Sequence, residues 1–436
     1  YLDGYLAEVN FIDGQALTAD SFGETGTYGE WKPIAYAGTY GTNGFYLPFE
    51  QDYTVEGFST VTYEGNGATQ YIGGTGFQPD FTWIKERSST SSHALYDSIR
   101  GALKQLESNT TDAESTASSM LTSFDTDGFS VGSSGAINQS GQTYVAWNWD
   151  MGGTTASNTS GSITSSVRAN TTYGQSIVSY TGTGVAATIG HGLSQAPEWI
   201  FLKGRDNTHS WVTYDATSGA TNYMALQATQ ATSASVSRWN NTTPTSTVFS
   251  IGTHVSPNTN GGAVIAYCFH SVTGYSKFGS YTGNGSATGT VVTLGFTPAF
   301  VMIKRTDAAK SWFMADNTRN PNNAVGKYNF ANLSDAEYDY TRLNFTSTGF
   351  QLASTDNTIN GSGNNYIYAA FADTREYAYW LDQSGNNNDW TSEGGLTESD
   401  VMVDSPTNNF ATLNPLDAGG TNTVAEGNLQ YTKSGS

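Results

Sequence analysis

Apolar and polar residues alternate over short stretches along most of the chain, which predicts many short β-strands. Glycine, asparagine and serine separate these stretches, as they do in the turns between strands. Three runs are almost entirely apolar, which predicts central strands packed on both faces. These runs are Tyr144 to Trp149, Ala263 to Phe269 and Tyr366 to Phe371. One segment, Asp97 to Glu107, instead has apolar residues at helical spacing and predicts a short helix.

The same strand pattern occurs three times along the chain, starting near Thr60, Ser176 and Lys277. Each copy opens with a strand that enters a glycine turn. A proline follows, and then an alternating strand that ends in lysine, with one spacing in all three copies. The corresponding residues are Gly65, Gly182 and Gly283, then Pro79 to Lys85, Pro197 to Lys203 and Pro298 to Lys304.

An aspartate follows each of these lysines at one fixed separation, which predicts a β-hairpin with lysine and aspartate near opposite ends of its paired arms. Because the pair recurs in every copy, a structural role is favoured over an active site. An exposed ion pair across the hairpin would contribute only about 0 to 1 kcal/mol. The pairs are Lys85 with Asp97, Lys203 with Asp215, and Lys304 with Asp316.

Each copy holds roughly six to eight strands in about 90 to 100 residues, which is typical of a compact β-sandwich. The expected fold class is therefore all-β, with three related jelly-roll-like sandwiches in series. The segment rich in Ser, Thr and Asn between the first two copies predicts a mobile linker. The expected boundaries are 58–153, 176–272 and 273–373 for the copies and 154–175 for the linker, with end segments at 1–50 and 374–436.

Composition supports folded β-domains. Of the 436 residues, 37% are hydrophobic, 13% aromatic and only 13% charged, which gives the chain enough apolar area to form cores. The net charge of −20 with 18 basic residues disfavours nucleic acid as a partner. No run approaches the about 18 apolar residues of a membrane span. Cys268 is the single cysteine and is expected to pack as a small hydrophobe, without an intrachain disulfide.

Both end segments resemble known proteins. Gly4 to Leu17, GYLAEVNFIDGQAL, is similar to the last strand of a laminin-G or concanavalin-like lectin sandwich, and Leu381 to Trp390, LDQSGNNNDW, is similar to its opening strand. With GTYGTNGFYLPF, ending at Phe49, and DSPTNNFATLNPL, starting at Asp404, these phrases resemble structural and tail-fibre proteins of marine tailed bacteriophages. The resemblance implies lectin-like end segments, a virion appendage that is commonly trimeric, and no catalytic residue. The repeats then form an insertion between the two ends.

Candidate chemistry is sparse. We assign no catalytic residue, because no two histidines have zinc-type helical spacing and the turn positions of His93 and His209 suit solvated side chains. Cys268 and His270 are expected on one face of a strand, in a core or interface and not as a dyad. The other histidines are His191, His254 and His270.

A metal site stays open. Asp125 to Gly128, DTDG, could start a calcium loop, but the rest of an EF-hand does not follow, so a turn is favoured. A denser cluster of oxygen donors is a further calcium candidate; its members are Asp382, Asn386, Asn388 and Asp389. No other cofactor is expected.

Aromatic side chains on a sandwich surface commonly stack on sugar rings. Four tryptophans are candidates for sugar binding, although burial in a core is the favoured alternative for each. They are Trp211, Trp239, Trp312 and Trp390. Asn-x-Ser/Thr triplets, for example at Asn109 and Asn170, are expected by chance in this composition and to be unmodified.

The leading functional hypothesis is a non-enzymatic structural protein on a tailed-phage virion surface, a tail fibre, spike or capsid fibre. Its expected partners are further copies of itself, as a homotrimer, other virion proteins, and a glycan or protein on the host cell. The alternative is a secreted bacterial protein with tandem carbohydrate-binding or adhesion modules. A third, enzymatic hypothesis requires a cleft with paired acids.

Overall fold

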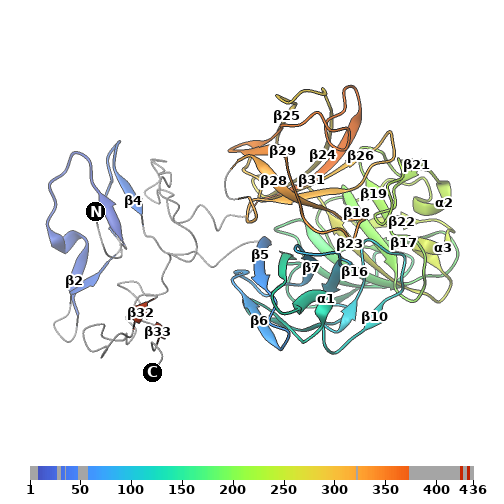
Figure 1. The fold of residues 1–436 in the computed structure, drawn as a ribbon, viewed down its shortest axis with the longest axis horizontal. Helices are drawn as coiled ribbons and strands as arrows, with labels where there is room; N and C mark the ends of the chain where they lie inside the picture. Colours follow the sequence, from blue (N-terminus) through green and yellow to red (C-terminus); the bar gives the residue numbers. More distant parts are fainter. Residues whose placement is uncertain are drawn as a thin grey trace. The chain divides into compact units, whose positions relative to one another are not determined.

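The computed structural model describes residues 8–26, 31–34, 36–47, 57–320, 323–372, 423–425 and 430–432. The chain divides into two units (Figure 1): Tyr1–Tyr53 with Thr374–Ser436, and Thr54–Asp373. No helix in these described segments is both long and apolar enough to cross a membrane.

The described part of the first unit consists of short antiparallel strand pairs. β1 (Val9–Phe11) pairs with β4 (Phe45–Leu47), and β2 (Gly23–Thr25) pairs with β3 (Trp31–Pro33) beside a 3-10 turn at Ala19–Ser21. A further pair joins β32 (Thr423–Ala425) to β33 (Gln430–Thr432).

The second unit contains the three copies, called repeats 1, 2 and 3 from here on. Each repeat has a large antiparallel sheet in which the last strand lies between the first strand and the lysine-ending strand. The strands of these sheets, in spatial order, are β5 (Phe58–Glu64), β13 (Thr143–Trp149), β7 (Phe81–Glu86) and β8 (Ala94–Asp97) in repeat 1; β16 (Gln175–Thr181), β23 (Ala263–Phe269), β18 (Trp199–Gly204) and β19 (Val212–Asp215) in repeat 2; and β24 (Ser276–Thr282), β31 (Asn365–Phe371), β26 (Phe300–Arg305) and β27 (Phe313–Asp316) in repeat 3.

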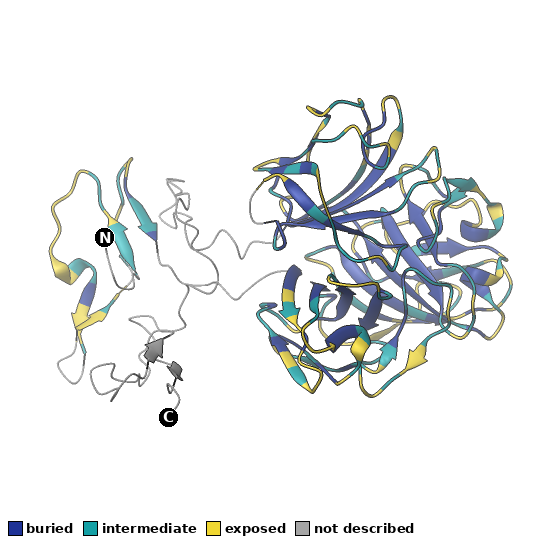
Figure 2. Cartoon of the chain, in the orientation of Figure 1, coloured by how far each residue is buried: buried dark blue, intermediate teal, exposed yellow. Residues whose placement is uncertain are grey.

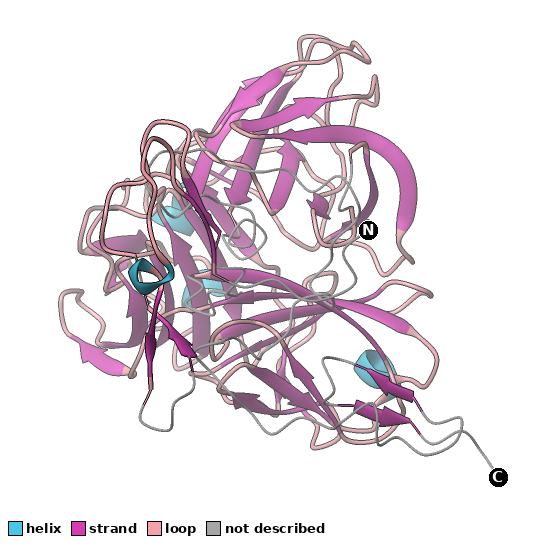
Figure 3. Ribbon diagram, turned by 90° about the vertical axis from the view of Figure 1, so that its left-hand side faces the viewer, coloured by secondary structure: helices cyan, strands magenta, loops and turns pink. Residues whose placement is uncertain are grey.

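Further strands form separate small sheets in repeats 1 and 2, whereas in repeat 3 they continue the large sheet beyond β27 into one eight-stranded sheet. They are β6 (Gln70–Gly73), β9 (Lys104–Gln105), β10 (Ser115–Thr116), β11 (Leu121–Asp125) and β12 (Gly128–Val131) in repeat 1; β17 (Ala187–Gly190), β20 (Asn222–Tyr223), β21 (Ser233–Ala234) and β22 (Val248–Ile251) in repeat 2; and β25 (Val291–Thr293), β28 (Val325–Phe330), β29 (Tyr338–Thr346) and β30 (Gly349–Leu352) in repeat 3. Three four-residue helices, α1 (Gly135–Asn138), α2 (Val236–Trp239) and α3 (Val255–Asn258), complete the described elements of repeats 1 and 2. The all-β sandwich class is confirmed (Figure 3).

The predicted central strands are packed on both faces because each serves two cores. In β23, Val264, Ala266 and Cys268 face a core private to repeat 2, whereas Ile265, Tyr267 and Phe269 face a second core. The second core is common to all three repeats and includes Trp147 from β13 and Phe371 from β31. Figure 2 shows this burial along the converging large sheets. Burial of aromatic rings in one shared core links the repeats into a single body.

Repeated polar contacts confirm that the three copies are one structural unit used three times. The buried side chains of Asn138, Asn258 and Asn360 each hold a pair of loops: their Nδ2 groups donate to Gly132 O, Gly252 O and Ser354 O at 2.8 Å in every repeat. The predicted turn glycines are required beside them. A Cβ on Gly65 or Gly182 would lie 2.3 Å from the carbonyl oxygen of Gln139 or Thr259, closer than any side chain tolerates.

Two local expectations are wrong. The segment expected to be a mobile linker forms β14 (Ala156–Asn158) and β15 (Ser165–Asn170), which extend the large sheet of repeat 2 beside β16. Because residues of all three repeats form one core, the sandwiches are packed against one another and are not separate domains in series. The helix expected at Asp97 to Glu107 is absent, because the Asp97 carboxylate accepts hydrogen bonds from the amides of Ile99 and Arg100 and holds a turn instead.

Candidate functional site

The contacts between repeats follow one scheme that closes into a ring. A loop of each repeat donates a backbone hydrogen bond to the residue two positions after the lysine of the next repeat: Glu114 N to Arg205 O at 2.6 Å, Thr232 N to Thr306 O at 2.9 Å, and Glu337 N to Arg87 O at 2.8 Å. The junctions are named 1–2, 2–3 and 3–1 after the repeats they join. Because the third junction returns to repeat 1, the ring is complete within one chain.

A ring nitrogen reinforces each junction at a second equivalent position. Trp211 Nε1 donates to Glu107 O at 2.9 Å, and Trp312 Nε1 donates to Ala225 O at 3.1 Å. In repeat 1 the position is His93, whose Nε2 lies 3.0 Å from Phe330 O. All three side chains are fully buried.

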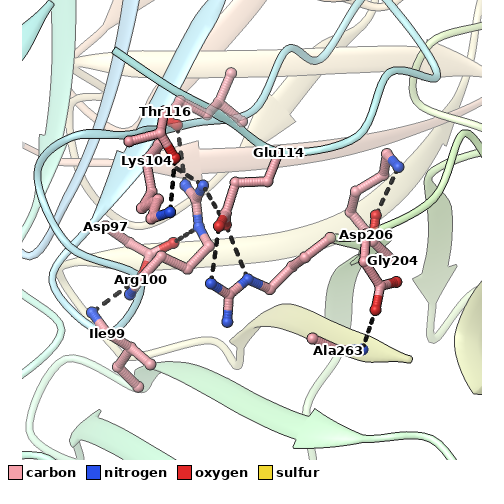
Figure 4. Close-up of polar contacts among 12 residues, drawn as sticks. Asp97, Ile99, Arg100, Lys104, Glu114, Thr116, Gly204, Asp206 and Ala263 are labelled. Atoms are coloured by element: carbon pink, nitrogen blue, oxygen red, sulfur yellow. Dashed lines mark hydrogen bonds and ion pairs between the residues drawn. The ribbon is translucent and has the colours of Figure 1, made fainter. Parts of the chain in front are cut away.

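Junction 1–2 contains a chain of four charged side chains (Figure 4). Arg100 pairs with Asp97 of the same turn, and its Nη1 lies 3.4 Å from Glu114 Oε2. Glu114 in turn accepts two hydrogen bonds from Arg205 of repeat 2, at 2.8 and 2.9 Å. Tyr267 of repeat 2 donates to Asp97 at 2.7 Å. Each of these four charged side chains therefore has a partner of opposite charge, which the burial of a charged group requires.

Junction 3–1 repeats this chain. Arg319 pairs with Asp316 at 2.7 Å and with Glu337 at 2.8 Å. Glu337 then accepts from Arg87 of repeat 1 at 2.9 and 3.1 Å. The Nε1 group of Trp147 takes the place of the tyrosine and donates to Asp316 at 3.0 Å. The neighbouring arginines lower the pKa of Glu337 against the opposing effect of burial.

Junction 2–3 carries neutral residues at the same positions. Ser218, Thr232 and Thr306 stand where junction 1–2 has Arg100, Glu114 and Arg205. A cavity of about 450 Å³ lies here, lined mainly by hydroxyl and amide side chains from repeats 2 and 3. Its lining includes Ser218, Asn222, Thr232, Thr306, Asp307 and Tyr366. This arrangement can bind a small polar group through hydrogen bonds.

A second open cavity, of about 500 Å³, lies between repeat 1 and β15. Asp80, Asp150, Arg168 and Asn170 line it. Arg168 pairs with Asp80, and Asn170 Nδ2 donates to Asp150 at 3.2 Å. Burial raises the pKa of Asp80 to about 6 despite the arginine. These contacts fix β15 to repeat 1.

The predicted ion pairs across the hairpins do not form. The register places each lysine and aspartate near opposite ends of the paired arms, as expected, with Asp97 opposite Phe81. Lys85, Lys203 and Lys304 are fully buried, and each donates to the carbonyl of the following residue at 2.6 to 2.7 Å. Burial lowers their pKa to about 8, 8 and 7. The lysines lie on the strand face that bears the shared core, so their recurrence has a structural basis.

The histidines and the cysteine have structural surroundings. The expectation of a solvated His93 is wrong: it is fully buried, and burial lowers its pKa to about 3. Burial also lowers the pKa of His191 to about 4, and its Nε2 contacts Thr245 O at 3.1 Å. Cys268 packs in the private core of repeat 2 as predicted, and burial raises the pKa of its thiol. His270 is buried close by, at 3% exposure.

The tryptophan candidates for sugar stacking are core residues. Trp211, Trp239 and Trp312 have at most 1% of their surface exposed, so no ring face is open to a pyranose. Trp390 lies outside the described residues.

Asp125 to Gly128 form a turn, as predicted: Asp125 ends β11, and Asp127 lies in the β11–β12 hairpin turn. Asp127 accepts from the amides of Gly74 at 3.2 Å and Gly76 at 2.6 Å. The cluster of Asp382, Asn386, Asn388 and Asp389 lies outside the described residues. Within the described part of the chain, no group of three or more His, Cys, Asp or Glu side chains is arranged to hold a metal ion.

The fold and the junctions define a class of protein, an all-β unit in which three related sandwiches close around one aromatic core. Residues 54–375 match the family model described as a domain of unknown function, DUF7483, and the chain belongs to that family. The matched residues coincide with the three repeats, so the family corresponds to the whole ring. A comparison with curated proteins gave no match.

Proposed function

We propose that the chain is a non-catalytic structural protein of a tailed-phage virion that presents β-domains for attachment to a host-surface glycan or protein. The closed ring carries this proposal, because it presents three related loop sets on one rigid support within a single chain. The resemblance of the end-segment sequences to structural and tail-fibre proteins of tailed phages supports the virion assignment.

The loops held by Asn138, Asn258 and Asn360 are the surfaces best suited to attachment. Each of these asparagines also accepts from the amide of a second loop: Asn66 at 2.9 Å, Thr183 at 2.7 Å and Asn284 at 2.9 Å. Most loop residues around these contacts are polar and exposed, and Val185 and Val255 add exposed apolar side chains in repeat 2. Three related sites on one body gain from multivalency, since binding at one site raises the effective concentration at the others.

The groups whose pKa is strongly shifted by burial support a structural role. The buried lysines, His93 and the charge chains of two junctions are engaged with neighbouring backbone and side chains, and they recur or alternate between repeats. Such groups stabilise the ring and leave binding to the surface loops.

The test is electron microscopy of the source particle, combined with sedimentation velocity and host-cell binding by the purified full-length chain. We expect a symmetric multimer, a homotrimer, on the virion and saturable binding to host cells. A monomeric protein secreted by a bacterium, with sugar binding by the free chain, would instead support the carbohydrate-binding or adhesion alternative.

A further inference from the structure

Junction 2–3 keeps the aspartate of the charge chain and differs from the other two junctions at the three other members. Repeat 2 has Ser218 where repeats 1 and 3 have Arg100 and Arg319. The glutamate and the second arginine are replaced as well, by Thr232 and Thr306. The backbone bond from Thr232 N to Thr306 O is nevertheless kept at 2.9 Å. The main-chain frame of the site is therefore conserved, and the charged side chains are absent from it.

The buried aspartate of this frame remains. Asp215 is 3% exposed, and Ser218 N donates to its Oδ1 at 2.7 Å. In the other junctions an arginine and a ring donor from the next repeat also reach the aspartate. At junction 2–3, Ala369 stands at the position of the aromatic donors Tyr267 and Trp147. Among the described residues from 57 to 372, no lysine or arginine pairs with Asp215. Burial accordingly raises the pKa of this carboxyl group.

The cavity occupies the place that the charge chain fills at junction 1–2. Its lining residues Asn222 and Thr306 correspond to Lys104 and Arg205, and Asp307 corresponds to Asp206, which Figure 4 shows beside the chain at junction 1–2. The hydroxyl groups of Thr213 and Thr232 are buried nearby and have no hydrogen-bond partner among the described residues. Thr213 is fully buried and shares a strand face with Asp215.

A guanidinium group matches these features. At junction 1–2 the Arg100 guanidinium donates to the Asp97 carboxylate and to the carbonyls of Leu95 and Lys104, both at 2.9 Å. The equivalent strand and loop of repeat 2 have Asp215, Thr213 and Asn222 at those positions. Asn222 lines the cavity, and Asp215 adjoins it through the hydrogen bond from the lining residue Ser218. Asp307 is the one carboxylate lining the cavity, and it already pairs with Arg305, so its charge is balanced within repeat 3. The buried Asp215, whose Oδ1 accepts from the amide of the lining residue Ser218, is the carboxylate that favours a cation here.

We propose that the cavity at junction 2–3 binds a guanidinium group from outside the chain, in the place that the chain's own arginines take at the other two junctions. The ligand is a free guanidinium compound or an arginine side chain of a partner protein. The site is independent of the proposed attachment loops, so either proposal can fail alone.

The test is isothermal titration calorimetry of the full chain with agmatine and with its urea analogue, N-carbamoylputrescine, which keeps the shape and the terminal ammonium group of agmatine but has a neutral urea in place of the guanidinium. We expect agmatine to bind at least tenfold more tightly, a difference of about 1.4 kcal/mol. Equal affinities, or no heat from either compound, would overturn the proposal.

Two substitutions that fill the cavity from opposite sides locate the binding. Ser218→Arg supplies the missing guanidinium from repeat 2, and Thr306→Arg enters from repeat 3. We expect each to reduce agmatine affinity at least tenfold, whereas Ser218→Ala keeps it within about threefold. Thermal unfolding of each variant checks that the chain is folded. Because Ser218→Arg and Thr306→Arg are made independently, the test can still be carried out if one of them does not fold. Unchanged binding in a folded arginine variant would place the ligand elsewhere and contradict the proposal.

A capped Gly-Arg-Gly peptide separates the two sources of the ligand. Binding of the peptide at least as tightly as agmatine indicates an arginine side chain of a partner, because the flanking peptide groups then contact the exposed rim formed by Thr217, Thr282 and Asn365. Binding of agmatine alone indicates a free small molecule.

Discussion

His93 and Trp211 occupy the same position in successive repeats and donate a ring N–H to the backbone of the preceding repeat in the ring. His93 can do so only in one neutral form. Its Nδ1 accepts a hydrogen bond from Trp83 Nε1 at 2.8 Å, so Nε2 carries the proton and donates to Phe330 O. The residue that contacts this side chain also differs between the repeats. Repeat 1 has His93 with Trp83, whereas repeats 2 and 3 have a tryptophan in place of the histidine and Phe201 or Met302 in place of Trp83. The histidine and the tryptophan that donates to it therefore form a matched pair.

This pair predicts a loss of stability in mild acid. The pKa of His93 is lowered from 6.5 to about 3, so the unfolded chain binds more protons between these values. The free energy of unfolding should fall as the pH decreases from about 6.5 to 3, by several kcal/mol at most. The measurement is urea denaturation of the wild-type chain and of the double variant Trp83→Phe with His93→Trp, which copies repeat 2. We expect a shallower pH dependence in the variant, and parallel curves would contradict this role of His93.

The shared core predicts that the three repeats unfold together. Trp147 of repeat 1 lies 5.8 Å from the ring of Phe300 in repeat 3, and Phe81 of repeat 1 lies 4.3 Å from the ring of Tyr267 in repeat 2. Scanning calorimetry should show one transition for residues 54–373, with equal calorimetric and van't Hoff enthalpies. Trp147→Ala should destabilise the whole unit by about 3 to 5 kcal/mol, whereas Val291→Ala, at an exposed position, should change stability by less than about 0.5 kcal/mol. Separate transitions for the repeats would show that the shared core does not couple them.

Local pattern and repetition were sufficient to predict the strands but not the ring. The apolar run from Ala263 to Phe269 predicts burial on both faces, and this is confirmed, yet a sequence does not say what covers the second face. The cover comes from the other two repeats. The apolar spacing of Ile99 and Leu106 suggested a helix because both side chains pack against the shared core, while the Asp97 carboxylate imposes a turn. Tertiary burial and side-chain hydrogen bonding thus overrode helical periodicity.

The charge chains were missed because their members are far apart in the sequence. Glu114 and Arg205 are separated by 91 residues. The signal was present in the alignment of the repeats, where the aspartate is followed three residues later by Arg100, Ser218 or Arg319. The lysine and aspartate spacing predicts ion pairs that do not form, whereas the aspartates of repeats 1 and 3 pair with the arginines three residues later.

Removal of Arg100 should be far more costly than removal of Arg205. The Arg100 side chain is fully buried, so Arg100→Met leaves the Asp97 carboxylate buried without its cation and should cost about 3 to 5 kcal/mol. Arg205 keeps 21% of its side-chain surface exposed, and Arg205→Met should cost about 1 kcal/mol or less. Denaturant unfolding of both variants at neutral pH measures the difference. Similar losses would indicate that Asp97 is satisfied by Tyr267 and the backbone without the arginine.

Replacement of a buried lysine should have an effect that depends on alkaline pH. Burial lowers the pKa of Lys203 from 10.5 to about 8, so the unfolded chain holds more protons between pH 8 and 10.5, and the wild-type free energy of unfolding gains from this group as the pH rises through that range. Lys203→Met removes this pH-dependent contribution to the free energy of unfolding and also leaves the carbonyls of Gly204 and Asn207 without this donor. We therefore expect the variant to be most favourable relative to wild type near pH 7, and to lose about 2 to 3 kcal/mol of that relative stability by pH 10. The measurement is urea denaturation at several pH values, with Lys277→Met at a half-buried position as the matched control. A difference between wild type and Lys203→Met that stays constant from pH 7 to 10 would show that burial does not lower the pKa of Lys203 in the folded chain.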